Sequence, residues 1–303
     1  MSLCSRNVIL GFIIIVTFFS LLLLGCTENG DSSKEDLIES GSTIQKLADG
    51  FKFPEGPAVD SEGNVYFSDD GNNRIHKWSV TEKKLSTFRE ESFGILGLYF
   101  DKNDNLYACQ RAKGRIVSIA PNGQETILAE AYKGKPFNKA NDLWVDPKGG
   151  VYFTGREPLR ENSGYVFYIT PDRKEVIRVG DDYQKPNGII GTKDGQMLYI
   201  SDRKDKKTYA YKINADGTLS NKKLFANLGS DGMTLDEQGN LYVTTNAVHV
   251  FSPDGKKIAM IEVPERPSNL CFGGKDSRTL FITAGKSFYS VKMSVAGMYG
   301  PRG

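Results

Sequence analysis

The sequence predicts an all-β protein whose main domain is a six-bladed β-propeller. A short strand with an aromatic residue at its centre recurs every 39 to 47 residues, which is the period of propeller blades built from four strands. A turn rich in Gly, Asn or Asp precedes nearly every one of these strands, as expected for hairpins. No stretch after residue 43 shows the apolar periodicity of a helix.

The N-terminal residues 1–25 have the pattern of a signal peptide. Arg6 precedes a mostly apolar run of about 17 residues, Val8 to Leu24, which is short for a membrane span and suits a signal-peptide core. Gly25 and Cys26 follow, and this ending resembles the lipobox of bacterial lipoproteins. The resemblance implies lipidation of Cys26 and an exported protein anchored to the membrane, on its periplasmic or cell-surface side. A retained N-terminal anchor helix is the alternative.

Residues 26–42 are polar and are predicted to form a flexible tether, and residues 43–303 are predicted to form the propeller. Apolar segments flank each aromatic-centred strand, so each repeat supplies one blade. The last repeat is one strand short, and we expect residues 43–47 to supply its outer strand, because this closure removes open sheet edges. The aromatic-centred strands are Val65–Phe67, Leu106–Ala108, Val151–Phe153, Leu198–Ile200, Leu241–Val243 and Leu280–Ile282.

Composition argues against several classes of protein. Lys and Arg total 39 against 37 Asp and Glu, a net charge of +2, which argues against a nucleic-acid-binding protein. The chain has two His and no Cys-x-x-Cys pair, so zinc is unsupported. Cys109 and Cys271 lie in apolar strand patterns and are expected to be buried thiols, with a disulfide between them as the alternative. We expect a monomer.

One repeat position carries the predicted chemistry, and it lies at the start of each innermost strand. Equivalent positions of these strands converge on the axis of a propeller, so their side chains are predicted to meet there. Two carboxylates with amide oxygens suit Ca²⁺, with other divalent cations possible, and the predicted ligands are Glu55, Asn141, Asn187 and Asp231. The residues at this position are Glu55, Leu96, Asn141, Asn187, Asp231 and Asn269.

The alternative is that these residues only form turns, where Asn and Asp are common. Against it, the same offset is polar in repeats that lie far apart in the sequence, while neighbouring offsets are apolar or Gly. Two carboxylates at a narrow axis would also repel each other unless a cation lay between them. The metal site is therefore the favoured hypothesis.

Motifs around the innermost strands occur in a fixed order along the chain. They are Pro54–Pro57, Asn141–Asp146, Pro186–Ile189, Ser230–Met233, and Pro267–Gly274 followed by Thr279–Thr283. Together they resemble the SMP-30/gluconolactonase/LRE-like family over residues 43–293. The resemblance implies a Ca²⁺-dependent lactone hydrolase, some relatives of which cleave organophosphates. It also implies that Glu55, Asn187 and Asp231 bind the metal, that Asn141 binds metal or substrate, and that Asp231 is the catalytic carboxylate.

The chain departs from this family at two places near the site. Lys139 lies where sugar lactonases of the family often have Arg, and Lys lacks the planar fork that binds hydroxyl groups. Gly155 lies where bacterial relatives often have Asp, so a carboxylate near the mouth is absent. We expect Lys139, Asn141 and Asn269 to contact the substrate, and the absent carboxylate argues against D-glucono-lactone itself as that substrate.

The predicted mechanism follows from the metal. The cation would polarise the lactone carbonyl, and Asp231 would act as general base toward the attacking water. Direct nucleophilic attack by Asp231 is the competing version. Two other functions remain open at this point: an organophosphate-type hydrolase that uses the same metal, and a non-catalytic propeller that binds a ligand.

Overall fold

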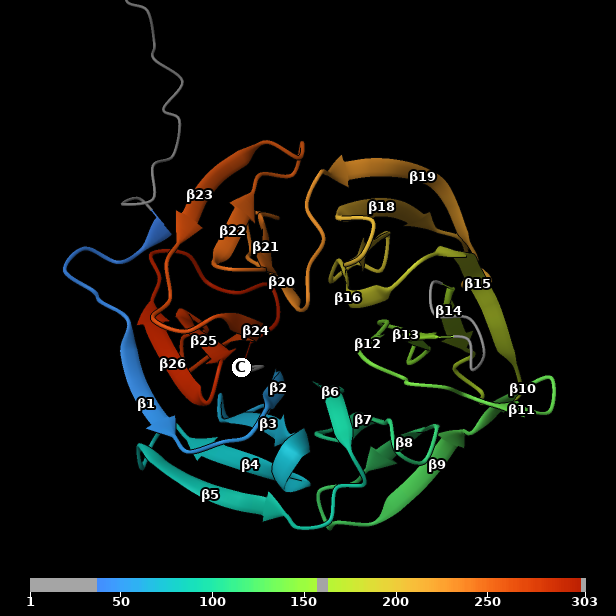
Figure 1. Ribbon diagram of the computed structural model, residues 1–303, viewed down its shortest axis with the longest axis horizontal. Helices are drawn as coiled ribbons and strands as arrows, with labels where there is room; N and C mark the ends of the chain where they lie inside the picture. The colour runs from blue at the N-terminus through green and yellow to red at the C-terminus, as the bar shows by residue number, and fades with distance from the viewer. Residues whose placement is uncertain (1–36, 157–162, 301–303) are drawn as a thin grey trace, which may run out of the picture. The chain divides into compact units, whose positions relative to one another are not determined.

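The computed structural model describes residues 37–156 and 163–300, and these residues form a ring of six four-stranded antiparallel sheets around a central axis (Figure 1). The six-bladed propeller predicted from the sequence is confirmed. Within five of the blades the strands follow the chain order from the axis outward, and in the sixth the outermost strand is the N-terminal β1. The innermost strands β2, β6, β12, β16, β20 and β24 therefore surround the axis.

The strand bounds are as follows. Blade one has β2 (Pro54–Val59), β3 (Val65–Asp69), β4 (Arg74–Ser79) and β5 (Lys84–Arg89), and blade two has β6 (Ile95–Phe100), β7 (Leu106–Gln110), β8 (Arg115–Ile119) and β9 (Glu125–Ala129). Blade three has β12 (Leu143–Val145), β13 (Val151–Arg156), β14 (Gly164–Ile169) and β15 (Val176–Tyr183), and blade four has β16 (Pro186–Gly191), β17 (Met197–Asp202), β18 (Lys207–Ile213) and β19 (Leu219–Ala226). Blade five has β20 (Met233–Leu235), β21 (Leu241–Thr244), β22 (Val248–Phe251) and β23 (Lys257–Ile261), and blade six has β24 (Pro267–Gly273), β25 (Thr279–Ala284), β26 (Ser287–Lys292) and β1 (Gln45–Asp49). The short elements are the 3₁₀ helix η1 (Asp70–Asn72) and the hairpin β10 (Ala131–Tyr132) with β11 (Lys135–Pro136).

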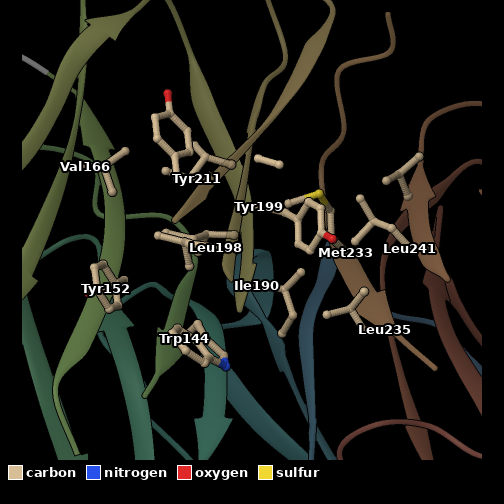
Figure 2. Packing of buried hydrophobic residues seen from close by; sticks show 14 of the residues in the cluster. Trp144, Tyr152, Val166, Ile190, Leu198, Tyr199, Tyr211, Met233, Leu235 and Leu241 are labelled. Atoms are coloured by element: carbon tan, nitrogen blue, oxygen red, sulfur yellow. The ribbon is translucent and has the colours of Figure 1, made fainter. Parts of the chain in front are cut away.

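The hydrophobic core lies between neighbouring blades. The aromatic residues at the centres of the second strands are all buried, from Tyr66 in β3 to Phe281 in β25. Figure 2 shows one such layer, where Trp144 of blade three and Met233 of blade five enclose Leu198 of blade four. Inner strands are covered on both faces, which explains why they are apolar on both sides of the pleat.

Each blade is tied to the next by a buried hydrogen bond near the start of its innermost strand, and together these six bonds form an inter-blade hydrogen-bond ring. A Ser or Thr hydroxyl takes part in five of them. The ring holds the residues that begin the innermost strands, which are the positions predicted to carry the chemistry. The bonds run from Ser68 Oγ to Leu96 O (2.9 Å), Gly97 N to Asn141 O (2.8 Å), Thr154 Oγ1 to Asn187 O (2.8 Å), Ser230 N to Ser201 Oγ (2.5 Å), Thr244 Oγ1 to Ser268 O (2.8 Å) and Ser268 Oγ to Pro54 O (2.7 Å).

The N-terminal segment closes the propeller. Strand β1 pairs with β26 of the last blade, as predicted, although it begins two residues later than expected and extends to Asp49. Leu37 and Ile38, which were assigned to the flexible tether, instead contact blade six: Leu37 is 4% exposed and Ile38 pairs with Met293. The tether is therefore shorter than the predicted 26–42.

The predicted signal peptide and the lipidated Cys26 lie outside the described residues, so export and membrane anchoring stay predictions. Across residues 37–156 and 163–300, every helix falls short of the length and apolar character needed to cross a bilayer. Cys109 and Cys271 are buried free thiols, so the alternative of a disulfide between them is wrong.

The C-terminal segment was not predicted to have a role, and it returns to the axis. The backbone of Ala296 accepts a hydrogen bond from Glu237 N (2.9 Å), and Met298 N donates to Leu235 O (2.9 Å). Both contacts lie at the end of β20 that is remote from the inter-blade hydrogen-bond ring. Residues 296–300 therefore line the opposite end of the central channel.

Thr244→Val tests the inter-blade hydrogen-bond ring. The valine removes the hydroxyl that donates to Ser268 O and accepts from Gly232 N, both at 2.8 Å and both buried. Unpaired buried backbone groups are costly, so we expect the free energy of unfolding to fall by about 2–3 kcal/mol in urea denaturation. Thr87→Val on the exposed face of β5 is the matched control and is expected to change stability by less than about 0.5 kcal/mol.

Candidate functional site

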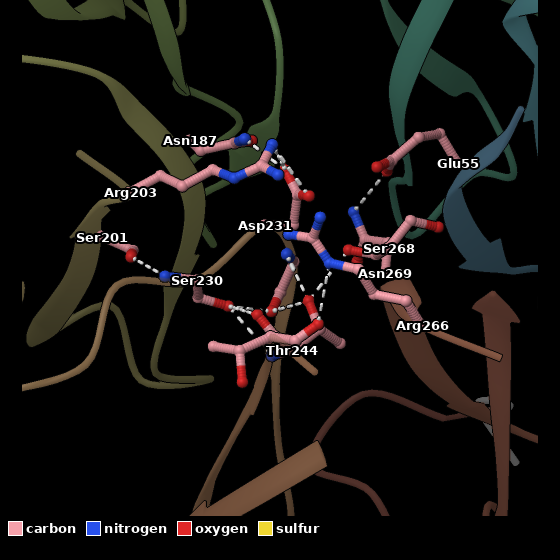
Figure 3. Close-up of polar contacts among 12 residues, drawn as sticks. Glu55, Asn187, Ser201, Arg203, Ser230, Asp231, Thr244, Arg266, Ser268 and Asn269 are labelled. Atoms are coloured by element: carbon pink, nitrogen blue, oxygen red, sulfur yellow. Dashed lines mark hydrogen bonds and ion pairs between the residues drawn. The ribbon is translucent and has the colours of Figure 1, made fainter. Parts of the chain in front are cut away.

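The structure brings the predicted polar residues together where the innermost strands begin. Asn187 Nδ2 of blade four donates to Asp231 Oδ1 of blade five at 2.5 Å, and Asn269 Nδ2 of blade six donates to Glu55 Oε2 of blade one at 3.2 Å. Figure 3 shows Glu55 and Asp231 on opposite sides of this polar centre. The side chain of Asn141 makes no hydrogen bond with any described residue, but its backbone belongs to the inter-blade hydrogen-bond ring.

Glycines in neighbouring blades make room for these side chains. A Cβ atom at Gly232 would lie 2.0 Å from Asn269 Oδ1, and one at Gly97 would lie 2.6 Å from Asp142 Oδ1. No side chain fits at such distances. Gly232 and Gly97 therefore leave the space into which the next blade extends the side chains of Asn269 and Asp142.

Asp142 is a third buried carboxylate that the sequence analysis did not single out. It follows Asn141 at a position that four other blades fill with glycine, namely Gly56, Gly97, Gly188 and Gly232. Asp142 Oδ1 accepts the backbone N–H of Leu143 at 3.0 Å. Burial raises the pKa of Asp142 to about 7. A comparison of the six repeats at the residue that follows the polar position (Asn141 in this blade) would have revealed Asp142.

The two predicted carboxylates also resist ionisation. Burial, and then the negative charges of Asp231 and Asp142, raise the pKa of Glu55 to about 8, although the backbone N–H of Gly56 opposes the shift. Burial raises the pKa of Asp231 as well, and the positive charge of Arg203 acts against it. Three carboxyl groups around one axis therefore lack enough compensating positive charge.

Arg203 is a second residue that the sequence analysis missed. Its Nη1 atom lies 3.0 Å from both carboxylate oxygens of Asp231. Figure 3 shows the guanidinium groups of Arg203 and Arg266 beside Asp231, and Arg266 Nε donates to the backbone oxygen of Thr245 at 3.2 Å. The signal was available in the sequence, because Arg203 is one of three arginines at the same repeat position in neighbouring blades.

The acceptor groups at the centre fit a hard divalent cation. Glu55 Oε1, Asn187 Oδ1 and the amide oxygen of Asn141 accept no hydrogen bond from the described residues, and Asp231 Oδ2 accepts only from Arg203. No three His, Cys, Asp or Glu side chains within the described part of the chain form a metal cluster by themselves. Amide oxygens would therefore have to complete the ligand set, and all-oxygen coordination is what Ca²⁺ prefers.

The two departures from the family occupy defined places. Asp69 accepts the backbone N–H groups of residues 52–53 at 3.1 and 2.9 Å, and Asp202 accepts those of residues 184–185 at 2.6 and 3.0 Å. Gly155 occupies the equivalent position of blade three, so the carboxylate absent there is of a kind that holds a loop rather than a substrate. Lys139 is exposed, with a φ of 51°, in the segment that leads into the inner strand of blade three at Leu143.

A cavity of about 890 Å³ lies along the axis behind the polar centre. Asp142 and Asn269 line one end of it, and Met298 and Tyr299 of the C-terminal segment line the other. The polar centre lies at the end of the axis away from the C-terminal segment. Arg203 and Lys139 lie in the loops at this end, which we call the mouth.

Asp142→Asn tests the electrostatic strain in metal-free protein. The unfolded chain ionises its carboxyl groups near pH 4, whereas Asp142 and Glu55 in the folded chain stay protonated to about pH 7 and 8. The free energy of unfolding in chelator should therefore fall as pH rises from 5 to 8, because the unfolded state binds fewer protons. The Asp142→Asn substitution removes one of these groups and should make the decline smaller by about 2 kcal/mol.

Urea denaturation at pH 5 and pH 8 measures this difference. Asp254→Asn, in an exposed turn, is the control and should leave the change in the free energy of unfolding between pH 5 and pH 8 as it is in the wild type. If the free energy of unfolding depends on pH in the same way in wild type and Asp142→Asn, ionisation of Asp142 does not destabilise the folded protein.

Comparisons with known proteins agree with this geometry. The family model for the SMP-30/Gluconolactonase/LRE-like region matches residues 53–286. A gluconolactonase from Zymomonas mobilis is 29% identical over 303 aligned residues, which cover 86% of this chain and 84% of that protein. Regucalcin from Xenopus laevis is 26% identical over 260 residues, covering 78% of this chain and 85% of that protein.

The solved structures show the same architecture. A gluconolactonase structure from Xanthomonas campestris superposes with a TM-score of 0.78 at 25% identity, covering 86% of this chain and 92% of that chain. Because the family model spans most of the propeller, including all six positions at the axis, this chain belongs to the SMP-30/gluconolactonase/LRE-like family.

Proposed function

We propose that this protein is a metal-dependent hydrolase of lactones, with Ca²⁺ as the expected cation and Asp231 as the catalytic carboxylate. The observation that carries the proposal is the group of uncompensated oxygen acceptors from blades one, three, four and five at one end of the axis. The similarity of this chain to gluconolactonases supports a lactone as the substrate. Export and anchoring through Cys26 are part of the proposal and rest on the sequence alone.

Glu55, Asn141, Asn187 and Asp231 would hold the cation. A bound divalent cation would supply Lewis acidity to the lactone carbonyl, which lowers the barrier to attack by water. The donor set includes two carboxylates, so binding would also remove the repulsion that raises the pKa of Glu55. The metal would then stabilise the folded protein by neutralising groups that are strained without it.

Asp231 is placed to act on the attacking water. One of its oxygens is fixed by Asn187, and both contact Arg203, so the carboxylate has a defined orientation. A carboxylate held beside the reacting carbonyl can accept the proton that water loses on attack. Lys139, Asn141 and Asn269 provide donors around the same centre and would orient the hydroxyl groups of the substrate.

Asp231→Asn tests the catalytic assignment. The amide keeps the size of the side chain and loses its basicity, so we expect kcat/KM for a lactone panel to fall by about 10²–10⁴-fold. Activity is measured with Ca²⁺ present, with chelator, and with Ca²⁺ restored. Asp254→Asn in an exposed turn is the control. Full activity in Asp231→Asn would exclude both the base and the nucleophile versions of the mechanism.

Glu55→Gln tests the cation site without relying on catalysis. Removing one of the two predicted ligand charges should weaken Ca²⁺ binding at least about tenfold in isothermal titration calorimetry. Glu130→Gln, on an exposed segment before β10, should bind as the wild type does. If the wild-type protein releases no heat with Ca²⁺, Mg²⁺ or Mn²⁺, the axial residues hold no metal.

A further inference from the structure

Three arginines share one repeat position in three consecutive blades. Arg111, Arg156 and Arg203 each follow the second strand's buried Cys109, Thr154 or Ser201 by two residues. The equivalent residues of the other blades are uncharged or acidic: Asp70, Asn246 and Gly285. The same position in neighbouring blades faces the same side of the mouth, so the positive charge is concentrated over blades two to four.

Two lysines strengthen this side of the mouth. Lys139 and Lys185 each precede the polar position of their blade, at Asn141 and Asn187, by two residues. We call the five residues Arg111, Lys139, Arg156, Lys185 and Arg203 the basic arc. The net charge of the whole chain is only +2, so the basic arc is a local concentration rather than a reflection of composition.

Only two members of the basic arc form ion pairs with described residues. Arg203 binds Asp231 at 3.0 Å, and Arg111 binds Asp70 more loosely at 3.4 Å. No ion pair joins Lys139, Arg156 or Lys185 to another described residue, although Arg156 and Lys185 are half-buried. Half-buried cations that form no ion pair are unfavourable, so the contacts within the described part of the chain do not account for the presence of Arg156 and Lys185.

The members of the basic arc lie close enough to repel one another. Burial and the neighbouring charges of Arg111 and Arg203 lower the pKa of Arg156. Burial and the charges of Arg156 and Arg203 lower the pKa of Lys185, and Lys139 adds to the effect. Both groups are also attracted to Asp231. If a divalent cation binds Asp231, the basic arc loses much of its counter-charge and becomes a site for an anion.

We propose that the basic arc binds an oxyanion carried by the substrate, so that this hydrolase acts on acidic sugar lactones bearing a phosphate, sulfonate or carboxylate group. The inference rests on the proposed lactonase function. The cation held at the axis would polarise the lactone carbonyl there, and the oxyanion would extend from the axis over blades two to four. Guanidinium forks bind oxyanions through two parallel hydrogen bonds, and Arg156, which forms no ion pair with a described residue, lies within the electrostatic reach of Arg111 and Arg203. The positive mouth would also attract anionic lactones from solution.

The test compares lactones that share one ring and differ in the group at C6. D-glucono-1,5-lactone is assayed with Ca²⁺ beside the same lactone with phosphate or sulfonate at C6, and beside the lactone whose C6 is a carboxylate. We expect kcat/KM to be at least about tenfold higher for one or more of the anionic lactones. The three anionic arms distinguish phosphate, sulfonate and carboxylate as the preferred group.

Variants of the basic arc separate charge recognition from general damage. In Arg156→Gln and Lys185→Gln the ratio of kcat/KM between the anionic and the neutral lactone should fall at least about fivefold. Lys212→Gln is the control. It removes one positive charge at an exposed site near the C-terminal end of strand β18, away from the basic arc, and should leave this ratio unchanged. Two results would overturn the proposal. One is a kcat/KM for the neutral lactone as high as that for every anionic lactone, and the other is an equal fall in kcat/KM for the anionic and neutral lactones in the variants.

A binding measurement distinguishes failure of this inference from failure of the proposed function. Calorimetry with gluconate and gluconate 6-phosphate in the presence of Ca²⁺ requires no catalysis. Tighter binding of the phosphate, lost in Arg156→Gln, supports the basic arc even if no lactone is hydrolysed, in which case the lactonase proposal alone fails. Equal binding of the two acids by the wild type contradicts the anion site, whatever the activity.

Discussion

The inter-blade hydrogen-bond ring is the constraint on which the site depends. Its six bonds lie where the innermost strands begin, and each joins a buried backbone group to a neighbouring blade. A buried carbonyl or N–H left without a partner is costly, so the blades cannot shift along one another without losing several such bonds. The register of six separate sheets is thereby fixed at the level where Glu55, Asn187 and Asp231 lie.

The same ring explains why a small set of residue types recurs around it. Ser or Thr supplies the hydroxyl on the second strand, and the glycine that follows the polar position leaves space for the backbone or side chain of the next blade. Asp142 is the exception, since it adds a carboxylate where other blades have glycine. The fold therefore gathers negative charge at the axis in an environment that raises the pKa of each carboxyl.

The basic arc places positive charge beside the negative charge of the axial carboxylates. Arg203 is shared by both, because it binds Asp231 and also repels Arg156. Neither the carboxylates nor the remaining cations are fully compensated by described residues, and such unbalanced arrangements are typical of functional sites. A cation on the acidic side and an anion on the basic side would balance the whole arrangement.

Much of the fold could be predicted from the sequence, because its evidence is local and repeated. Aromatic-centred strands at a regular spacing predicted six blades, and the incomplete last repeat predicted closure by the N-terminal strand. The five polar positions could be predicted as well, since symmetry places equivalent residues around one axis. Packing of Leu37 and Ile38 against blade six could not be predicted, because two adjacent apolar residues in a polar segment are too few to show a strand or helix period.

The sequence alone determined the blade count, the closure and the polar residues at the axis, since each of these follows from a repeat. Tertiary structure alone decided which charges meet. Asp142 approaches Glu55, and Arg203 pairs with Asp231, across blade boundaries. The return of the C-terminal segment to the channel is likewise a tertiary contact. Electrostatic energy depends on distance in space and on burial, and neither is written in the spacing of residues along a chain.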